Sequence, residues 1–311
     1  MARFWTVSLL AAAMMLAGAP GQAAPLTAAE ILGGFNAVVL GDFSSRHDVE
    51  GRLMVGGNLA GGATFFNQPR GGAMPGFGAV NVAGNVAAGT YNVDNGGSVV
   101  VGGTSEGRFN LNGGGTLRTG DAGMSAADFL APLGALAGQL AALQANSAVT
   151  AGDLNNVAFN AVPDAAGRAV FQLSTSTLET FRNMVVNLNG ADTVVINVTG
   201  SSFRGGGNFN AGADVNRHVI WNFFEATSLD FGFWHGSVLA LNAAVTNSTP
   251  IEGTLVAASF NGNGELHDYG FAGRLPPVDP PVPVPEPASL SLMAVGLAAL
   301  AAARRRRRVA A

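Results

Sequence analysis

Residues 80–85, Val80-Asn81-Val82-Ala83-Gly84-Asn85, hold the pattern that decides the fold. Two valines flank a polar residue, as in a short strand, and a glycine–asparagine pair then turns the chain. Strands this short bury little by themselves, so the pattern predicts the stacked coils of a β-solenoid around one apolar interior. The same corner recurs upstream at Gly56-Gly57-Asn58 and downstream at Gly102-Gly103-Thr104, at intervals of 27 and 19 residues from Asn58 to Asn85 to Thr104.

The corner residues carry a geometric expectation. Glycine and asparagine tolerate positive φ angles, so we expect them to supply such angles at the tight corners. A β-sandwich is the alternative fold, because short strands joined by glycine-rich turns leave almost the same pattern. A mainly β structure is predicted in either case.

One segment, residues 125–146, interrupts the strands and is predicted to be a helix. Ser125 and Asp128 have the spacing of a capping box. Gly134 and Gly138 lie one turn apart and are expected to let the helix lie close along the solenoid flank. The predicted apolar face of the helix comprises Phe129, Leu130, Leu133, Leu136, Leu140 and Leu143.

Farther on, residues 193–198 alternate apolar with polar side chains, which predicts a half-exposed strand.

The composition indicates an exported structural domain and excludes several chemistries. The 311 residues include 44 glycines and no cysteine. Without cysteine there is no disulfide, no thiolate metal site and no cysteine nucleophile. Outside the terminal targeting segments, 10 basic and 19 acidic residues remain, a net charge near −9. This charge argues against nucleic acid and anionic lipid as partners, because both require basic patches.

Both ends of the chain carry targeting features. Residues 1–24 combine a positive charge, a short apolar run and small residues, the layout of a secretory signal peptide. Residues 276–283 are rich in proline, which predicts an extended spacer. The apolar run 288–303 has 16 residues, fewer than the roughly 20 that span a bilayer. Arginines 304–308 follow it, and such clustered charge stays on the cytoplasmic side.

Residues 284–311 resemble the PEP-CTERM sorting signal of Gram-negative bacteria. In that family a Pro-Glu-Pro motif, a short hydrophobic helix and a basic tail occur in this order and are processed by a membrane exosortase. The resemblance implies export through the inner membrane, transient anchoring by residues 288–303, and a cell-surface or extracellular location. A plain C-terminal membrane anchor is the alternative. The sorting residues are Pro285, Glu286, Pro287, Arg304, Arg305, Arg306, Arg307 and Arg308.

The body, residues 25–275, resembles the choice-of-anchor A domain. The matching phrases are residues 38–43, 48–52 and 56–58 at its start and 234–243, 251–257 and 264–271 at its end. Leu241 departs from the family, which often has proline there. The resemblance implies a right-handed β-solenoid with the helix along its side, similar to ice-binding-type solenoids, and a role as an adhesin or matrix protein. The family-motif positions are Gly56, Gly57, Asn58, Gly236, Ser237, Ala240, Asn242, Ala243, Gly253, Glu265 and His267.

The histidines are the candidates for metal or acid–base chemistry. His267 lies with Glu265 and Asp268 in the densest cluster, and Glu-x-His on a strand places both side chains on one face. No second motif has ligand spacing, so surface hydrogen bonding is the predicted role. We therefore predict no catalytic, cofactor-binding or metal-ligating residues. The other histidines are His47, His218 and His235, and the loop residues to which calcium would bind, without a motif to support it, are Asp94, Asn95, Asp214 and Asn216.

These features favour a secreted, surface-sorted adhesin-like or extracellular-matrix protein that binds polysaccharide and is not an enzyme. If exposed, Tyr91, Trp221 and Trp234 would stack on sugar rings; if buried, they belong to the core. A carbohydrate-active lyase or hydrolase on the same scaffold is an alternative, although the acidic residues form no pair. Ice binding is another, against which the irregular spacing of the threonines argues. The sequence determines neither the ligand nor the oligomeric state.

Overall fold

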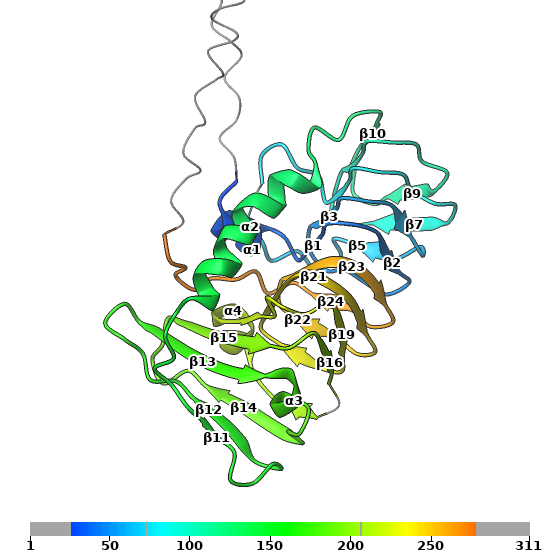
Figure 1. The fold of residues 1–311 in the computed structure, drawn as a ribbon. Coiled ribbons are helices and arrows are strands. Elements are labelled where there is room, and N and C mark those ends of the chain that lie inside the picture. Colours follow the sequence, from blue (N-terminus) through cyan, green and yellow to red (C-terminus); the bar gives the residue numbers. More distant parts are fainter. Residues whose placement is uncertain (1–25, 73, 206, 278–311) are drawn as a thin grey trace, which may run out of the picture. The chain divides into compact units, whose positions relative to one another are not determined.

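The computed structural model describes residues 26–72, 74–205 and 207–277, and the body that ends at Arg274 is built from coils of parallel strands (Figure 1). Each strand ladder forms one face of the coils, and we name these ladders face 1, face 2 and face 3. Face 1 has the order β10-β8-β6-β3-β1-β23-β21-β18-β15-β13, with parallel pairing throughout. Its strands are β10 (Leu117–Thr119), β8 (Val99–Val101), β6 (Val80–Val82), β3 (Leu53–Val55), β1 (Ala37–Val39), β23 (Leu255–Gly262), β21 (Ser237–Asn247), β18 (Val219–Asn222), β15 (Thr193–Thr199) and β13 (Arg168–Ser174).

Faces 2 and 3 follow face 1 in each coil. Face 2 consists of β16 (Ser202–Arg204), β19 (Ser228–Phe231), the second halves of β21 and β23, β2 (Phe43–Ser45) and β4 (Leu59–Ala60), and continues through bridges at Val86 and Ser105. On face 3, Val49 bridges two three-stranded ladders. The face 3 strands are β11 (Val149–Thr150), β12 (Val157–Asn160), β14 (Asn183–Asn187), β17 (Asn208–Phe209), β20 (Trp234–His235), β22 (Ile251–Glu252), β24 (Leu266–His267), β5 (Thr64–Phe65), β7 (Thr90–Val93) and β9 (Arg108–Leu111).

The coils do not stack in chain order. β1, the first strand, lies in the middle of face 1 between β3 and β23. The chain builds outward from β1 to β10, returns to the opposite end, and builds inward from β13 until β23 lies beside β1. The predicted mainly β solenoid is confirmed, whereas the sequence repeats gave no indication of this interleaved order. The right-handed winding stays a prediction.

Helix α2 (Ala126–Ala141) connects the β10 end of the solenoid with the β13 end and lies against face 1 (Figure 1). Sixteen residues span about 24 Å, the width of about five coils. The predicted capping box is present, because Asp128 Oδ2 accepts hydrogen bonds from Ser125 N at 2.7 Å and Ser125 Oγ at 2.9 Å. The other helices are α1 (Ala28–Gly34), α3 (Thr175–Leu178) and α4 (Ala213–His218).

Three details of the predicted helix are wrong. The helix ends at Ala141 rather than at residue 146, because Asn146 instead pairs with β13: its Oδ1 accepts from Val170 N at 2.7 Å. Leu130 is 46% exposed and lies off the apolar face. Gly134 and Gly138 face away from the sheet, since a Cβ at either position would meet no atom within 4 Å.

A ladder of amides holds the C-terminal half of α2 to face 1. Asn197 Nδ2 donates to Leu140 O at 2.6 Å, Asn222 Nδ2 to Ala137 O at 3.0 Å, and Gln172 Nε2 to Leu143 O at 3.0 Å. These bonds reach carbonyl groups in and just beyond the last turn of the helix. The prediction that residues 193–198 are half exposed is wrong. All six are buried, because α2 packs against the outer side of β15.

The apolar interior is continuous through the coils. Trp221 lies at its centre, with ring centroids 5.6 Å from Phe159, 5.8 Å from Phe209 and 4.7 Å from Trp234. A second apolar layer fills the space between face 1 and the helices, which explains why the outward-facing residues of several face 1 strands are also buried. Its members include Val38, Met54, Val195, Ile220, Leu239, Val256, Phe129, Leu133 and Leu136.

The corners between faces 1 and 2 are in the predicted register. Asn58 N donates to Asp42 Oδ1 at 2.7 Å, Asn85 N to Asn58 Oδ1 at 3.0 Å, and Thr104 N to Asn85 Oδ1 at 2.9 Å. The expected positive φ angles are wrong here, because none of these glycine–asparagine corners contains one. Glycine is required for space instead: a Cβ at Gly84 would lie 2.5 Å from Gly57 O.

Candidate ligand-binding face

Face 2 presents two straight rows of small, mostly polar side chains to solvent. Alternate residues point inward, so the outward positions of neighbouring coils align. The face spans eight coils, or about 34 Å at the spacing of neighbouring strands. By register, the first row is Ser202, Ser228, Ala244, Ser259, Asp42, Asn58, Asn85 and Thr104, and the second is Arg204, Asp230, Thr246, Asn261, Ser44, Ala60, Ala87 and Glu106.

Two of the four charged side chains on face 2 form an ion pair with each other. Arg204 Nε lies 3.2 Å from Asp230 Oδ2, and Thr246 Oγ1 donates to Asp230 Oδ1 at 2.9 Å. Asp42 Oδ1 accepts from Asn58 N and Asn58 Nδ2. The face is therefore hydrophilic, and Asp42 and Glu106 are the charges on it without an ion pair among the described residues. Its threonines, Thr104 and Thr246, lie in different rows, so they form no threonine ladder.

The family-motif residues lie mainly at corners and in the core. Gly56, Gly57 and Asn58 form the corner that leads from β3 to β4, and Ala240 and Ala243 are buried. Gly236 and Gly253 stack on adjacent coils with φ angles of 91° and 152°, and a Cβ on Gly253 would lie 2.7 Å from Gly236 O. Ser237 Oγ accepts from Thr254 N at 3.3 Å. Asn242 is exposed.

Glu265 and His267 lie in an ionic cluster on face 3, where the last coil meets the first. His267 Nδ1 is 2.7 Å from Glu252 Oε1, and His267 Nε2 is 2.8 Å from Glu265 Oε2. The hydrogen bond to Glu252, reinforced by Glu265 and by the charges of Glu252 and Glu50, raises the pKa of His267 to about 9 against the opposing effect of burial. Both ring nitrogens are engaged, so this imidazolium holds two carboxylates in place.

The cluster extends into the first coil. Asp268 N donates to Glu50 Oε2 at 2.9 Å, and Asp268 Oδ2 accepts from Arg70 N at 2.7 Å and Gly71 N at 3.1 Å. Arg70 also lies 3.5 Å from Glu50 Oε2. These contacts connect residues that are about 200 positions apart in the chain.

His235 extends the cluster on its other side. Its Nδ1 lies 2.7 Å from Asn216 Oδ1, and burial lowers its pKa, so the ring is neutral. Asn216 also bonds Glu252 at 3.3 Å. Sequence reasoning missed Glu252 as the partner of His267. The two similar phrases His235-Gly236-Ser237 and Glu252-Gly253-Thr254 could have indicated that His235 and Glu252 occupy the same position on adjacent coils. The strand register confirms this pairing and places His267 beside Glu252 on the next coil.

The His267 cluster predicts a loss of stability in mild alkali. The raised pKa stabilises the fold fully below about pH 6.5, and this contribution disappears as the pH rises through about 9. Because the ring and Glu265 are partly exposed, screening limits the loss to about 1–2 kcal/mol. Urea unfolding at pH 6.5 and 9.5 measures it. We expect His267→Gln to remove most of this pH dependence and His47→Gln, at an exposed histidine, to retain it; equal pH dependence in all three proteins would contradict the assignment.

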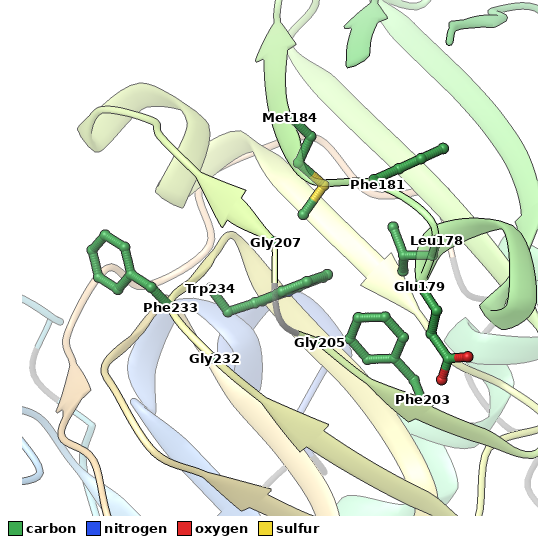
Figure 2. Close-up of a pocket in the computed structure, with 10 residues that line it drawn as sticks. All are labelled: Leu178, Glu179, Phe181, Met184, Phe203, Gly205, Gly207, Gly232, Phe233 and Trp234. Carbon is green, nitrogen blue, oxygen red and sulfur yellow. The ribbon is translucent and has the colours of Figure 1, made fainter. Parts of the chain in front are cut away.

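The aromatic residues considered for sugar stacking are not exposed. Tyr91, Trp221 and Trp234 are buried in the core, so the stacking hypothesis is wrong for all three. Trp234 also lines a hollow, which has a volume of about 10 Å³, room for one water molecule. Figure 2 shows this hollow, with Phe203 and Leu178 on one side and Phe233 turned away from it. It is too small for a sugar ring.

Three of the four residues considered for calcium are engaged in other contacts, and the fourth, Asp214, lies in the first turn of α4. Asn112 Nδ2 donates to Asp94 Oδ1 at 2.7 Å, Asn95 Nδ2 donates to Phe66 O at 2.7 Å, and Asn216 bonds His235 and Glu252. Within residues 26–72, 74–205 and 207–277, no three His, Asp or Glu side chains are arranged as a metal site.

The coils and face 2 together define a β-solenoid that presents rows of small, mostly polar side chains to solvent. Residues 28–268 match the family described as "Putative Ice-binding-like adhesive domain", and the chain belongs to it. Residues 283–308 match the PEP-CTERM protein-sorting motif. The predicted adhesin-like class and sorting signal are thus confirmed. The crystal structure of an ice-binding protein from the Antarctic ascomycete Antarctomyces psychrotrophicus is similar at 12% identity, with a TM-score of 0.26, over 78% of this chain and 96% of that one. No curated protein matches the chain.

The sorting motif implies export, sorting to the cell surface and processing at the C-terminus by an exosortase. The predicted signal peptide, residues 1–24, lies outside the described part of the chain, as do the apolar run 288–303 and all eight sorting residues. Within that part, no helix has the length and apolar character to cross a membrane.

Proposed function

We propose that this protein is a surface adhesin and that face 2 binds a neutral, hydroxyl-rich polysaccharide of a cell surface or matrix. The observation that carries the proposal is the pair of aligned outward rows on face 2. Their hydroxyl and amide groups both donate and accept hydrogen bonds, which matches the chemistry of sugar hydroxyls.

The shape of face 2 suits an extended polymer. Side chains as small as Ser228, Ala244 and Ser259 project little from the first row, so an extended polymer can approach along it. The long side chains of the face, Arg204 and Glu106, belong to the second row and lie in its two end coils. The strand ladder beneath is held by main-chain hydrogen bonds, and binding would therefore order few protein groups. Each sugar unit would contribute little, and affinity would come from many weak contacts along one chain.

The charges favour a neutral ligand over an acidic one. Outside the terminal targeting segments the acidic residues exceed the basic ones by 9, which repels polyanions at long range. On the face itself, Arg204 is paired with Asp230, so it is not free to bind a sugar carboxylate.

A glycan array probed with the mature protein, recovered from the exterior of the producing cells, tests this proposal. We expect binding to neutral polysaccharides that increases with chain length. The two competing functions give other results. Sugar release that depends on Glu265 or His267 would favour a carbohydrate-active enzyme, and inhibition of ice recrystallisation without glycan binding would favour ice binding.

We also propose that the exosortase removes the C-terminal segment. The 16-residue apolar run is short for a permanent anchor, and the basic residues 304–308 would be lost with it. Mass spectrometry of the mature surface protein is expected to find no peptide that contains Arg304–Arg308. An intact basic tail on the mature protein would instead support a plain membrane anchor.

A further inference from the structure

The two ends of the solenoid differ in how their edge strands are finished. At the β13 end, Asn146 and Ser147 donate main-chain hydrogen bonds to Val170 O, both at 3.1 Å, and β11 pairs antiparallel with β12. At the other end, β9 pairs with β7 and β10 with β8, and no further strand in the described part of the chain pairs with either. Every residue of β10 is exposed, Leu117 by 43%. Figure 1 shows β9 and β10 at this open end.

The backbone of β9 presents a regular set of unused hydrogen-bonding groups. Arg108 N donates to Gly89 O and Asn112 N to Val93 O, both at 2.8 Å. In a parallel ladder the intervening residues point the other way, so Phe109 and Leu111 direct their N–H and C=O groups out of the open end. Their side chains are half buried against the core. An edge with free main-chain N–H and C=O groups beside apolar side chains can pair with another extended strand.

We infer that the open end binds the open end of a second copy of this chain, with the two β9 strands antiparallel about a twofold axis at Asn110. The strand is self-complementary in this register. Phe109 of one copy lies opposite Leu111 of the other, so the two exchange both main-chain hydrogen bonds, and the axis repeats the exchange. Asn110 lies opposite itself. Its amide donates to Asn92 Oδ1 at 2.9 Å and has an oxygen and a second N–H left for its mate.

The charges at the open end are complementary in the same arrangement. An axis through the middle of face 3 exchanges faces 1 and 2, so Arg118 on face 1 lies over Ser105 and Glu106 on face 2 of the second copy. Arg118 and Glu106 are exposed, and neither has an ion-pair partner among the described residues. Because a twofold contact uses the open end of both copies, assembly stops at a closed dimer rather than a filament. This inference does not depend on the proposed ligand.

Charge substitutions at Asn110 test the axis directly. Analytical ultracentrifugation of the full exported chain is expected to show a reversible dimer. Asn110→Asp and Asn110→Arg each place like charges about 5 Å apart across the axis, and each is expected to weaken the dimer at least tenfold. Mixing the two variants is expected to restore dimerisation, because the opposite charges then meet. Asn261→Asp and Asn261→Arg, at an exposed asparagine of a central coil, are the matched controls and are expected to remain dimeric.

Amide hydrogen exchange adds a readout of the strand pairing. The amides of Phe109 and Leu111 are expected to become protected in the dimer and to exchange freely in the Asn110→Asp monomer. The inference is overturned if the wild-type chain is monomeric at all concentrations reached, which would include the case of a terminal segment of the same chain covering β9. It is also overturned if both Asn110 variants stay dimeric, or if their mixture does not associate.

Discussion

Gly84→Ala is expected to destabilise the solenoid by about 3 kcal/mol. The added Cβ would lie 2.5 Å from Gly57 O and 2.8 Å from Gly57 C, in the backbone of the neighbouring coil. Backbone atoms within a continuous ladder cannot rotate aside as a side chain can, so the two coils must separate at this corner. The separation would also lengthen the hydrogen bond from Asn85 N to Asn58 Oδ1. Urea unfolding of the purified chain measures the loss.

Gly134→Ala is the matched control for this substitution. Its new Cβ would meet no atom within 4 Å, and alanine favours a helix over glycine by about 1 kcal/mol. We therefore expect Gly134→Ala to stabilise the protein slightly. The same small effect in both variants would contradict the stacking of Gly84 on Gly57.

Asn36→Ala is expected to destabilise the junction between the first and last coils by about 3 kcal/mol. Asn36 is fully buried. Its Nδ2 donates to Gly253 O at 3.1 Å and His267 O at 2.9 Å, and its Oδ1 accepts from Gly51 N at 3.1 Å. Removing the amide leaves Gly51 N and Gly253 O without these hydrogen bonds in a buried site, whereas His267 O still accepts from Gly253 N and Tyr269 N.

Asn58→Ala provides the comparison for Asn36→Ala. Asn58 also bonds between coils, but it is exposed, and water can replace its hydrogen bonds. We expect a loss of about 1 kcal/mol. Hydrogen exchange should show the difference in location: β1 and β23 lose protection together in Asn36→Ala and keep it in Asn58→Ala. Loss of β1 protection alone would contradict the pairing of the first coil with the last.

The coils were predictable because their signals are local. A strand and its corner lie within six residues, as in Val80 to Asn85, and corner residues in adjacent coils bond one another at the predicted positions. The cause given for the glycines at residues 56–57, 84 and 102–103 was wrong, because none has a positive φ angle and their role is to admit the neighbouring backbone, whereas Gly113 and Gly114 do have the expected positive φ angles. Sequence alone does not show that a Cβ at Gly84 would lie 2.5 Å from the backbone of the neighbouring coil.

The order of the coils was not predictable, because one coil edge resembles another. Nothing near Val38 indicates that its strand pairs with Val256, more than 200 residues away. The ionic cluster was only partly predictable for the same reason. His267 and Glu265 are neighbours in the sequence, whereas Glu50 and Arg70 join the cluster only because the first coil stacks on the last. Burial of residues 193–198 likewise depends on where α2 returns.

The most direct test of the central claim, that face 2 is the adhesive surface, is polysaccharide binding by Ala244→Arg. Ala244 is exposed in the middle of the first row, and a long charged side chain there would hold a flat polymer away from the face. Ala135→Arg places the same side chain at an exposed position of α2. With the neutral polysaccharide that binds best, we predict at least tenfold weaker binding for Ala244→Arg, since about 1.4 kcal/mol is enough, and unchanged binding for Ala135→Arg. Equal binding by both variants would contradict the claim.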